Sequence, residues 1–235
     1  MSEVSALPVA LVTGASGGMG REIARDLART HRVILVGRDA ARLEAAVAAS
    51  GANATGVQLD LTDSAAVAAH IGTLDRLDVL VHAAAIGEVY AVHEAEAEDW
   101  TRTLAINVTA PAVLTKHALS LIRAARGTVV FLGSGASTRP VPGSAPYCAS
   151  KHALRAVADV LRIDEEPNFV RVVTVAPGQT DTAMLRDMID EAAYRADLYI
   201  QPTSVAQAVR YVVDAPADVQ ITDVAVRPRR EIARL

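Results

Sequence analysis

Short apolar runs alternate with amphipathic stretches along almost the whole chain. An apolar run at 9–12, for example, is followed by a stretch in which Ile23, Leu27 and Ala28 recur at helical spacing. Continuous apolar runs are typical of strands that are buried on both faces, and strands that alternate with helices are typical of parallel sheets. The pattern predicts an α/β fold with a doubly wound parallel sheet of about seven strands and helices on both faces.

The predicted elements follow from this pattern. The expected strands are 9–12, 32–37, one that ends at Asp60, 78–81, 128–132, 170–175 and 219–226. The expected helices pass through Leu27, through Leu43 and Val47, from the caps Thr62 and Asp63, from about Trp100 to Arg123, through Tyr147, and to Val212 from a capping box of Ser204 and Gln207. Within the long helix, Asn107 is a weak helix former and Pro111 lacks a backbone donor, so we expect a kink that can hold a water.

Composition sets limits on organisation and compartment. The chain has 235 residues, of which 51% are hydrophobic, and no change in composition marks a linker. We therefore expect one domain over 1–235, with tails at 1–7 and 228–235. A single cysteine, Cys148, fits a reducing compartment, and neither a signal peptide nor a membrane span is indicated. These features predict a cytoplasmic protein.

Charge and residue types exclude other classes of function. The formal net charge is −4 and aromatic residues make up 3%, which argues against a nucleic-acid-binding surface. The six histidines show no spacing typical of metal ligands, so no metal site is predicted.

A glycine-rich segment follows the first predicted strand and precedes the first helix. It reads Thr13-Gly14-Ala15-Ser16-Gly17-Gly18-Met19-Gly20. Such a loop lets a pyrophosphate approach the backbone, and the helix N-terminus adds free N–H groups. A turn that only joins two elements is the alternative. The dense glycines in this context favour a nucleotide site.

A tyrosine and a lysine stand four residues apart at Tyr147 and Lys151, and the chain has only one other lysine, Lys116. On a helix this spacing places both on one face. A nearby cation favours phenolate and moves the phenol toward acid/base chemistry. The alternative is an amphipathic helix with a half-buried Tyr and a solvated Lys.

Together these motifs resemble the short-chain dehydrogenases/reductases over nearly the whole chain, which implies a Rossmann-like fold. The resemblance implies a catalytic set of Asn107, Ser134, Tyr147 and Lys151, with the usual interval of thirteen residues between Ser134 and Tyr147. It implies that Ser134 orients a substrate carbonyl, Tyr147 transfers the proton, Lys151 lowers the pKa of the phenol and binds the ribose, and Asn107 holds a relay water. The cofactor-binding positions implied are Thr13, Gly14, Ser16, Gly18, Met19, Gly20, Arg38, Asp60, Leu61, Ala84, Tyr147, Lys151, Pro177, Gly178 and Thr182.

Two features depart from the family pattern. The segment after the fourth strand is usually Asn-Asn-Ala-Gly, whereas this chain has His82-Ala83-Ala84-Ala85. Gly14, Gly17 and Gly20 also fit the loop of longer, extended relatives, but 235 residues leave little room for their added substrate domain. We therefore favour the shorter branch.

The end of the second strand bears on the cofactor. NAD-using relatives commonly carry Asp where this chain has Gly37, and Arg38 follows as a candidate for the 2′-phosphate. Many NADP-using relatives have a second basic residue where this chain has Gly17, and Asp39 could turn toward the ribose. We expect NADP(H) to be preferred, with some use of NAD(H).

The resemblance also implies partners. We expect a small carbonyl or alcohol substrate and a homodimer or homotetramer, in which two long helices pair through small faces. The alanines proposed for those faces, which could equally pack on the sheet, are Ala105, Ala112, Ala118, Ala153, Ala156 and Ala158. The alternative function is a nucleotide-binding regulatory or scaffolding protein with a silent site.

Overall fold

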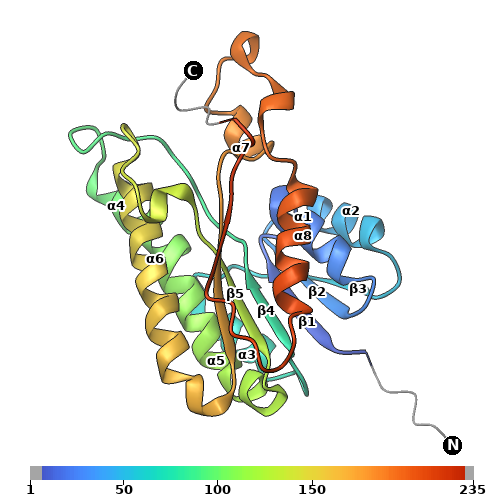
Figure 1. Ribbon diagram of the computed structural model, residues 1–235. Coiled ribbons are helices and arrows are strands. Elements are labelled where there is room, and N and C mark those ends of the chain that lie inside the picture. The colour runs from blue at the N-terminus through green and yellow to red at the C-terminus, as the bar shows by residue number, and fades with distance from the viewer. Residues whose placement is uncertain (1–6, 231–235) are drawn as a thin grey trace, which may run out of the picture.

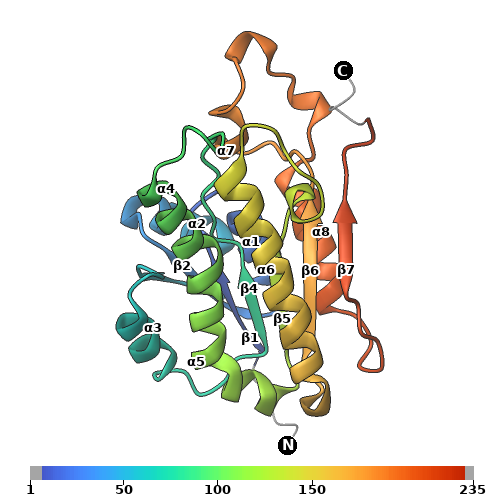
Figure 2. The ribbon, with the colours of Figure 1, turned by 90° about the vertical axis from the view of Figure 1, so that its left-hand side faces the viewer.

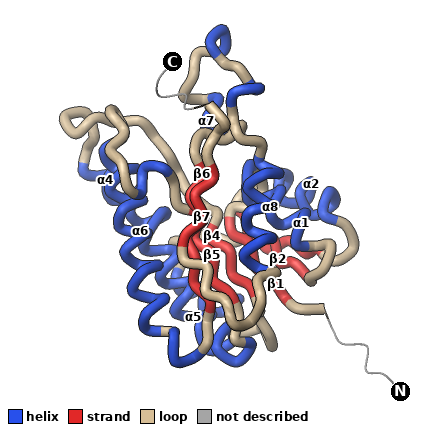
Figure 3. The backbone as a smooth tube through the Cα atoms, in the orientation of Figure 1, coloured by secondary structure: helices blue, strands red, loops and turns tan. Residues whose placement is uncertain are grey.

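A single seven-stranded parallel sheet organises the protein, which we describe from a computed structural model over residues 7–230. The strand order is β3-β2-β1-β4-β5-β6-β7, and every neighbouring pair is parallel. Strands β2 and β3 lie on one side of β1, and β4 to β7 lie on the other, so the strand order reverses beside β1. Figure 1 shows this sheet edge-on between two layers of helices, and Figure 3 shows the strands enclosed by them. The predicted doubly wound α/β fold is confirmed.

The central strands are short apolar runs, as expected, whereas the edge strands β3 and β7 are largely exposed or half-buried. The strands are β1 (Val9–Thr13), β2 (Arg32–Gly37), β3 (Ala54–Gln58), β4 (Val79–His82), β5 (Thr128–Leu132), β6 (Arg171–Pro177) and β7 (Asp223–Val226). All residues of β1, β4 and β5 are buried. Helices on both faces exclude water from these central strands, which is why their sequences do not alternate.

The helices connect successive strands. They are α1 (Gly18–Leu27), α2 (Ala40–Ser50), α3 (Ser64–Ile71), α4 (Ala97–Leu104), α5 (Ala110–Ala125), α6 (Ala145–Asp164), α7 (Ala183–Arg186) and α8 (Pro202–Val213). One apolar cluster packs α1, α2 and α8 against one sheet face, and a second packs α3, α5 and α6 against the other. Figure 2 shows α3, α5 and α6 in front of the sheet.

The long helix contains the interruption that the sequence predicts. A π-helical segment, Ala105–Thr109, joins α4 to α5, so that one helical run extends over Ala97–Ala125. This run is long and apolar enough to cross a membrane by length and composition, but the core helix of a soluble protein passes the same test. Leu114, Ala118 and Ile122 are buried against the sheet, which accounts for its apolar character.

Two predicted boundaries at the C-terminal end are wrong. Helix α8 begins at Pro202, after Gln201, and not at a capping box of Ser204 and Gln207. Proline suits the first helical position because its fixed φ is already helical and its missing N–H is not needed there. The pair Ser204 and Gln207 therefore lies inside the helix.

The last strand is shorter than expected, 223–226 instead of 219–226. The carbonyl of Val219 accepts a hydrogen bond from the Arg171 guanidinium, and the N–H of Val219 closes a turn onto Pro216. Both backbone polar groups of Val219 are thus used outside the ladder. Similarly, only Asp63 caps α3, because the Thr62 hydroxyl donates to Asp60. The tail predictions concern residues that lie largely outside the described range.

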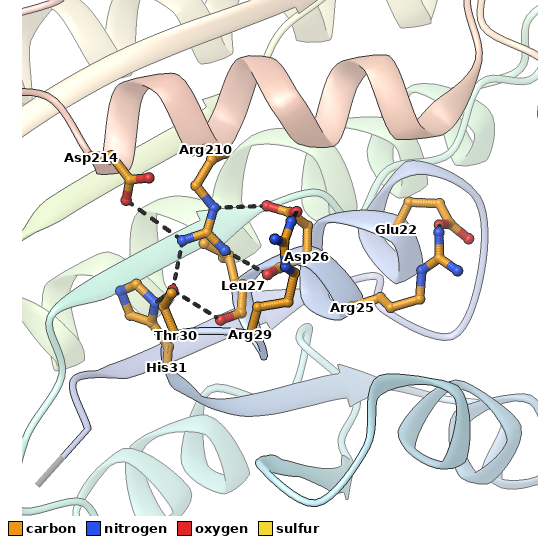
Figure 4. A network of polar contacts seen from close by, with 9 residues as sticks. All are labelled: Glu22, Arg25, Asp26, Leu27, Arg29, Thr30, His31, Arg210 and Asp214. Atoms are coloured by element: carbon orange, nitrogen blue, oxygen red, sulfur yellow. Dashed lines mark hydrogen bonds and ion pairs between the residues drawn. The ribbon is translucent and has the colours of Figure 1, made fainter.

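Helices α1 and α8 are joined by a polar network that surrounds Arg210 (Figure 4). The Arg210 guanidinium donates to the Asp26 carboxylate at 2.8 Å and to the Thr30 hydroxyl at 2.6 Å. Both partners of the ion pair are mostly buried, with 17% and 19% of their side chains exposed. Asp26 also pairs with Arg29, whose side chain is 78% exposed. One carboxylate therefore has a buried and an exposed cationic partner.

We expect Arg210→Ala to destabilise the protein by about 2–3 kcal/mol, because it removes the buried cationic partner of Asp26 and one hydrogen bond of Thr30 from a partly buried site. Arg29→Ala is the matched control and should cost less than about 0.5 kcal/mol, since exposed pairs contribute little. Urea unfolding of both variants measures the difference. Equal losses would show that burial does not separate the two pairs.

Candidate active site

The glycine loop is fixed by close backbone packing. Gly14 has φ of +64°, and a Cβ atom there would lie 2.7 Å from the Cα of Ala84. Gly18 also has positive φ and opens α1. These positions require glycine, because a side chain would be strained at both and would collide with the backbone at Gly14. The loop therefore presents bare backbone and the N-terminus of α1, an arrangement suited to a pyrophosphate.

A cleft of about 480 Å³ lies at the C-terminal edge of the sheet, beside this loop. The predicted cofactor positions that line it are Gly14, Ser16, Gly18, Met19, Gly20, Arg38, Asp60, Leu61, Ala84 and Thr182. Sequence reasoning missed other lining residues, notably Arg42, Thr62, Ile106 and Met184. Thr13, Pro177, Gly178 and the four predicted catalytic residues are not part of its lining. The cleft has the position and the donors that a dinucleotide needs.

The segment after β4 is held against the glycine loop. The Thr13 hydroxyl accepts hydrogen bonds from the N–H groups of Ala83 and Ala84, at 3.1 and 3.2 Å. His82 is buried, stacks on Phe131 and forms a 2.8 Å hydrogen bond with Thr115. Burial lowers the pKa of His82 to about 3, so the imidazole is neutral. His82 thus packs in the core, whereas Ala83, Ala84 and Ala85 are half-buried and line the cleft.

Asn107 lies in the π-helical segment and joins three parts of the site. Its Oδ1 accepts from the Ile86 N–H, and its Nδ2 donates to the Ile86 carbonyl, both at 2.9 Å. Nδ2 also donates to the Ser150 hydroxyl at 3.0 Å, and that hydroxyl donates to the Tyr147 carbonyl at 2.7 Å. The Asn107 side chain therefore connects the segment after β4 to α6. Its amide hydrogens are both engaged by protein groups.

Ser134 follows β5 and begins a short 3₁₀ turn, Gly135–Ser137. Its N–H donates to the Ser137 hydroxyl, and its own hydroxyl accepts from the Ala136 N–H, each at 3.1 Å. This pair of contacts fixes the serine at the strand end. The Ser134 side chain also acts on the Tyr147 phenol, because a hydrogen bond between them lowers the pKa of the phenol.

Lys151 is buried, with 3% of its surface exposed, and its Nζ donates to the Leu132 carbonyl at 2.8 Å. Leu132 is the last residue of β5, so this bond ties α6 to the strand that leads into Ser134. The Nζ atom lies 5.7 Å from the centroid of the Tyr147 ring. The predicted placement of the amine beside the phenol is therefore observed.

The direction of the pKa shift of Tyr147 differs from the one that the resemblance implies. Burial raises the pKa of the Tyr147 phenol, and the Ser134 hydrogen bond opposes this rise. Burial also lowers the pKa of Lys151 to about 8. The pKa of the phenol is thus raised, opposite to the lowering expected from Lys151, and removal from water is the main cause.

The segment between β6 and α8 extends beyond the ends of the strands (Figures 1 and 2), and its residues Thr182, Ala183 and Met184 line the cleft. Thr182 caps α7, and its methyl group lies 3.5 Å from where a Cβ on Gly18 would be. Asp181 accepts hydrogen bonds from Tyr194 and from Arg186, which hold the segment together and lower the pKa of this carboxyl, Tyr194 most strongly. The segment therefore packs on the glycine loop while folding on itself.

Comparisons with known proteins identify related chains. Residues 8–193 match the family model described as short chain dehydrogenase. An inactive 2-(S)-hydroxypropyl-CoM dehydrogenase of Xanthobacter autotrophicus is 33% identical over 79% of this chain and 88% of its own. An NADP-dependent 3-hydroxy acid dehydrogenase of Salmonella typhi is 31% identical over 94% of each chain. The solved closed form of a serine dehydrogenase complexed with NADP+ has a TM-score of 0.87 and 29% identity, covering 93% of this chain and 94% of its own.

The buried Lys151 predicts a pH-dependent cost in stability. A pKa lowered from 10.5 to about 8 means that the folded state disfavours the charged amine, a cost of about 3 kcal/mol below pH 8 that is relieved as pH rises to 10.5. Lys151→Met removes the charge but loses the bond to Leu132. We expect the variant to be about 1–2 kcal/mol more stable at pH 7, and this advantage to vanish by pH 10.5.

Urea unfolding at pH 7, 8.5 and 10 measures this difference. The exposed Lys116 supplies the matched control, Lys116→Met, which should show no such pH-dependent gain. A Lys151→Met variant that is less stable than the wild type at pH 7 would contradict the expected cost of the buried charge.

Proposed function

The chain belongs to the short-chain dehydrogenase family, and we propose that it transfers hydride between a nicotinamide cofactor and a small carbonyl or secondary alcohol. The observation that carries this proposal is the convergence of Ser134, Tyr147 and Lys151, with Asn107 linked to their helix, at the sheet edge that also bears the cleft. Ligands of open parallel sheets bind at that edge.

The proposed roles follow from the local contacts. A bound reduced nicotinamide supplies the hydride for the carbonyl carbon. The Tyr147 hydroxyl donates its proton to the carbonyl oxygen, and Ser134 hydrogen-bonds to the same oxygen, since their side chains already interact. A neutral phenol is the form that can donate, and the raised pKa of Tyr147 keeps it in that form. Lys151 then lowers the energy of the phenolate left behind.

A proton relay through Asn107 would use its backbone. Both amide hydrogens of the side chain are engaged by Ile86 and Ser150. Pro111 has no N–H to donate to the Asn107 carbonyl four residues earlier, so that carbonyl lacks its ordinary helical donor. We infer that a water bound there, beyond the buried Lys151, replenishes the proton that Tyr147 gives up.

We infer a preference for NADP(H), with NAD(H) also used. Gly37 leaves no carboxylate at the end of β2, and Arg38 lines the cleft. Asp39 is engaged elsewhere, because its carboxylate caps α2 by accepting from the Arg42 N–H at 2.9 Å. The NADP-bound serine dehydrogenase structure and the NADP-dependent 3-hydroxy acid relative support this preference.

A panel of carbonyls and alcohols, followed by nicotinamide absorbance with both cofactors, tests the proposed reaction. The names of the relatives suggest including 3-hydroxy acids and serine beside simple secondary alcohols. The alternative is a nucleotide-binding protein with a silent site, and the similarity to a dehydrogenase named inactive favours considering it. Nucleotide binding without turnover across the panel would select that alternative.

Tyr147→Phe should lower kcat by about 10² to 10⁴, because it removes the proton donor. The dissociation constant for the cofactor should stay within about twofold, since the phenyl ring is retained. Tyr211→Phe, at a position that is 67% exposed on α8, is the control and should keep full activity. Steady-state kinetics and cofactor titration measure both, and more than about a tenth of wild-type turnover in Tyr147→Phe would exclude the assigned role.

We also propose a homodimer or homotetramer. Val160 and Ile163 on α6 are 57% and 66% exposed and point away from the sheet, whereas Ala118 and Ala158, two of the alanines predicted for helix pairing, are buried on it. Large apolar side chains on one outer helix face are typical of interaction surfaces. The proposed interface therefore uses the outer face of α6, where Ala156 is exposed.

Light scattering at micromolar concentration should give a mass of two or four chains of 24.6 kDa. The double variant Val160→Glu/Ile163→Glu should reduce that mass, because it places charges in an apolar contact. Tyr211→Glu, on the opposite side of the sheet, is the control. A wild-type mass of one chain would rule out the assembly.

A further inference from the structure

Arg42, in the first turn of α2, directs its guanidinium over the glycine loop. A Cβ atom built on Gly17 would lie 2.5 Å from the Nη2 of Arg42. Gly17 has an extended backbone, with φ of −175°, which any residue can adopt. The close approach of Arg42, and not the backbone conformation, is therefore what a side chain at position 17 would disturb.

Arg42 and Arg38 both line the same cleft. Among the described residues, the hydrogen bonds of both arginines involve only backbone atoms: the Arg42 N–H donates to Asp39, and the Arg38 carbonyl accepts from Gln58. Neither guanidinium forms an ion pair within residues 7–230. Two arginines thus line one cleft, and neither guanidinium is paired with a carboxylate of the described residues.

The nearby carboxylates form their hydrogen bonds with other groups. Asp39 caps α2, and Asp60 accepts two hydrogen bonds from Thr62, at 2.9 and 2.7 Å. These two bonds lower the pKa of Asp60 more than the charge of Arg38 does. Both arginines also lie near the N-terminus of α2, where the helix dipole disfavours positive charge. A dianionic ligand between the two guanidinium groups would relieve this repulsion and form charge-assisted hydrogen bonds.

We propose that Arg42 is a second specificity-determining residue, which together with Arg38 binds a phosphate monoester on the 2′ position of the adenosine ribose. Gly17 contributes to this phosphate site, because the absence of its side chain makes room for the Arg42 guanidinium. The identity of the nucleotide rests on the proposed function, but the phosphate contact is testable by binding alone.

Titration calorimetry with four ligands isolates the contact. 2′,5′-ADP differs from 5′-AMP only by the 2′-phosphate, and NADPH differs from NADH in the same way. The ratio of the two dissociation constants in each pair therefore measures what the phosphate contributes to binding. We expect Arg42→Ala to raise the dissociation constants of 2′,5′-ADP and NADPH about tenfold, because a charge-assisted hydrogen bond is lost. The dissociation constants of 5′-AMP and NADH should change less than about twofold.

Three further variants separate the role of Arg42 from net charge and from folding. Arg42→Lys keeps a cation and should retain most of the phosphate preference. Gly17→Ala should displace the guanidinium and lower the preference in the same direction as Arg42→Ala. Arg29→Ala, which removes an equally positive but 78% exposed side chain just beyond the C-terminal end of α1, should leave all four dissociation constants within about twofold.

The outcomes distinguish this inference from the proposed function. If Arg42→Ala changes the 2′-phosphorylated and unphosphorylated ligands equally, or changes neither, the role of Arg42 is wrong even where hydride transfer is observed. If 2′,5′-ADP binds more tightly than 5′-AMP through Arg42 but no carbonyl is turned over, the phosphate contact stands and hydride transfer fails. A wild-type protein that binds none of the four ligands overturns both.

Discussion

The amide of Asn107 is the contact on which the geometry of the candidate site depends. It binds both backbone groups of Ile86 and the Ser150 hydroxyl, which in turn binds the Tyr147 carbonyl. A regular helix would direct this side chain differently, since the π-helical segment adds a residue to one turn. The irregularity therefore sets the distance between the cleft wall after β4 and the helix that carries the tyrosine.

Burial of Lys151 disfavours the charged form of its amine. The amine is removed from water and has one backbone acceptor, so its pKa falls toward 8 and the charged form costs stability. The same burial raises the pKa of Tyr147 and keeps the phenol protonated. A buried phenol beside a buried amine is poorly optimised for stability, and groups with such shifted pKa values are concentrated at functional sites.

The periodicity of the sequence was sufficient to predict the sheet, because strands buried on both faces leave long apolar runs. The sequence also predicted that Tyr147 and Lys151 share one helix face, since that depends only on their spacing of four residues. The contact of Arg42 with Gly17 could not be read in this way, because it joins α2 to the loop before α1 through a long flexible side chain. The start of β7 was missed because Arg171, remote in sequence, takes the Val219 carbonyl.

The alanines after β4 are compatible with a working cleft because the contacts there are made by backbone atoms. Thr13 holds the N–H groups of Ala83 and Ala84, while Gly14 packs directly against Ala84. Neither contact needs a side chain beyond Cβ at positions 83 and 84. The polar side chain that the family usually places at position 82 is replaced by a neutral imidazole that bonds to Thr115 inside the core. The departure therefore changes how β4 is anchored to α5 while the wall beside the glycine loop keeps its backbone contacts.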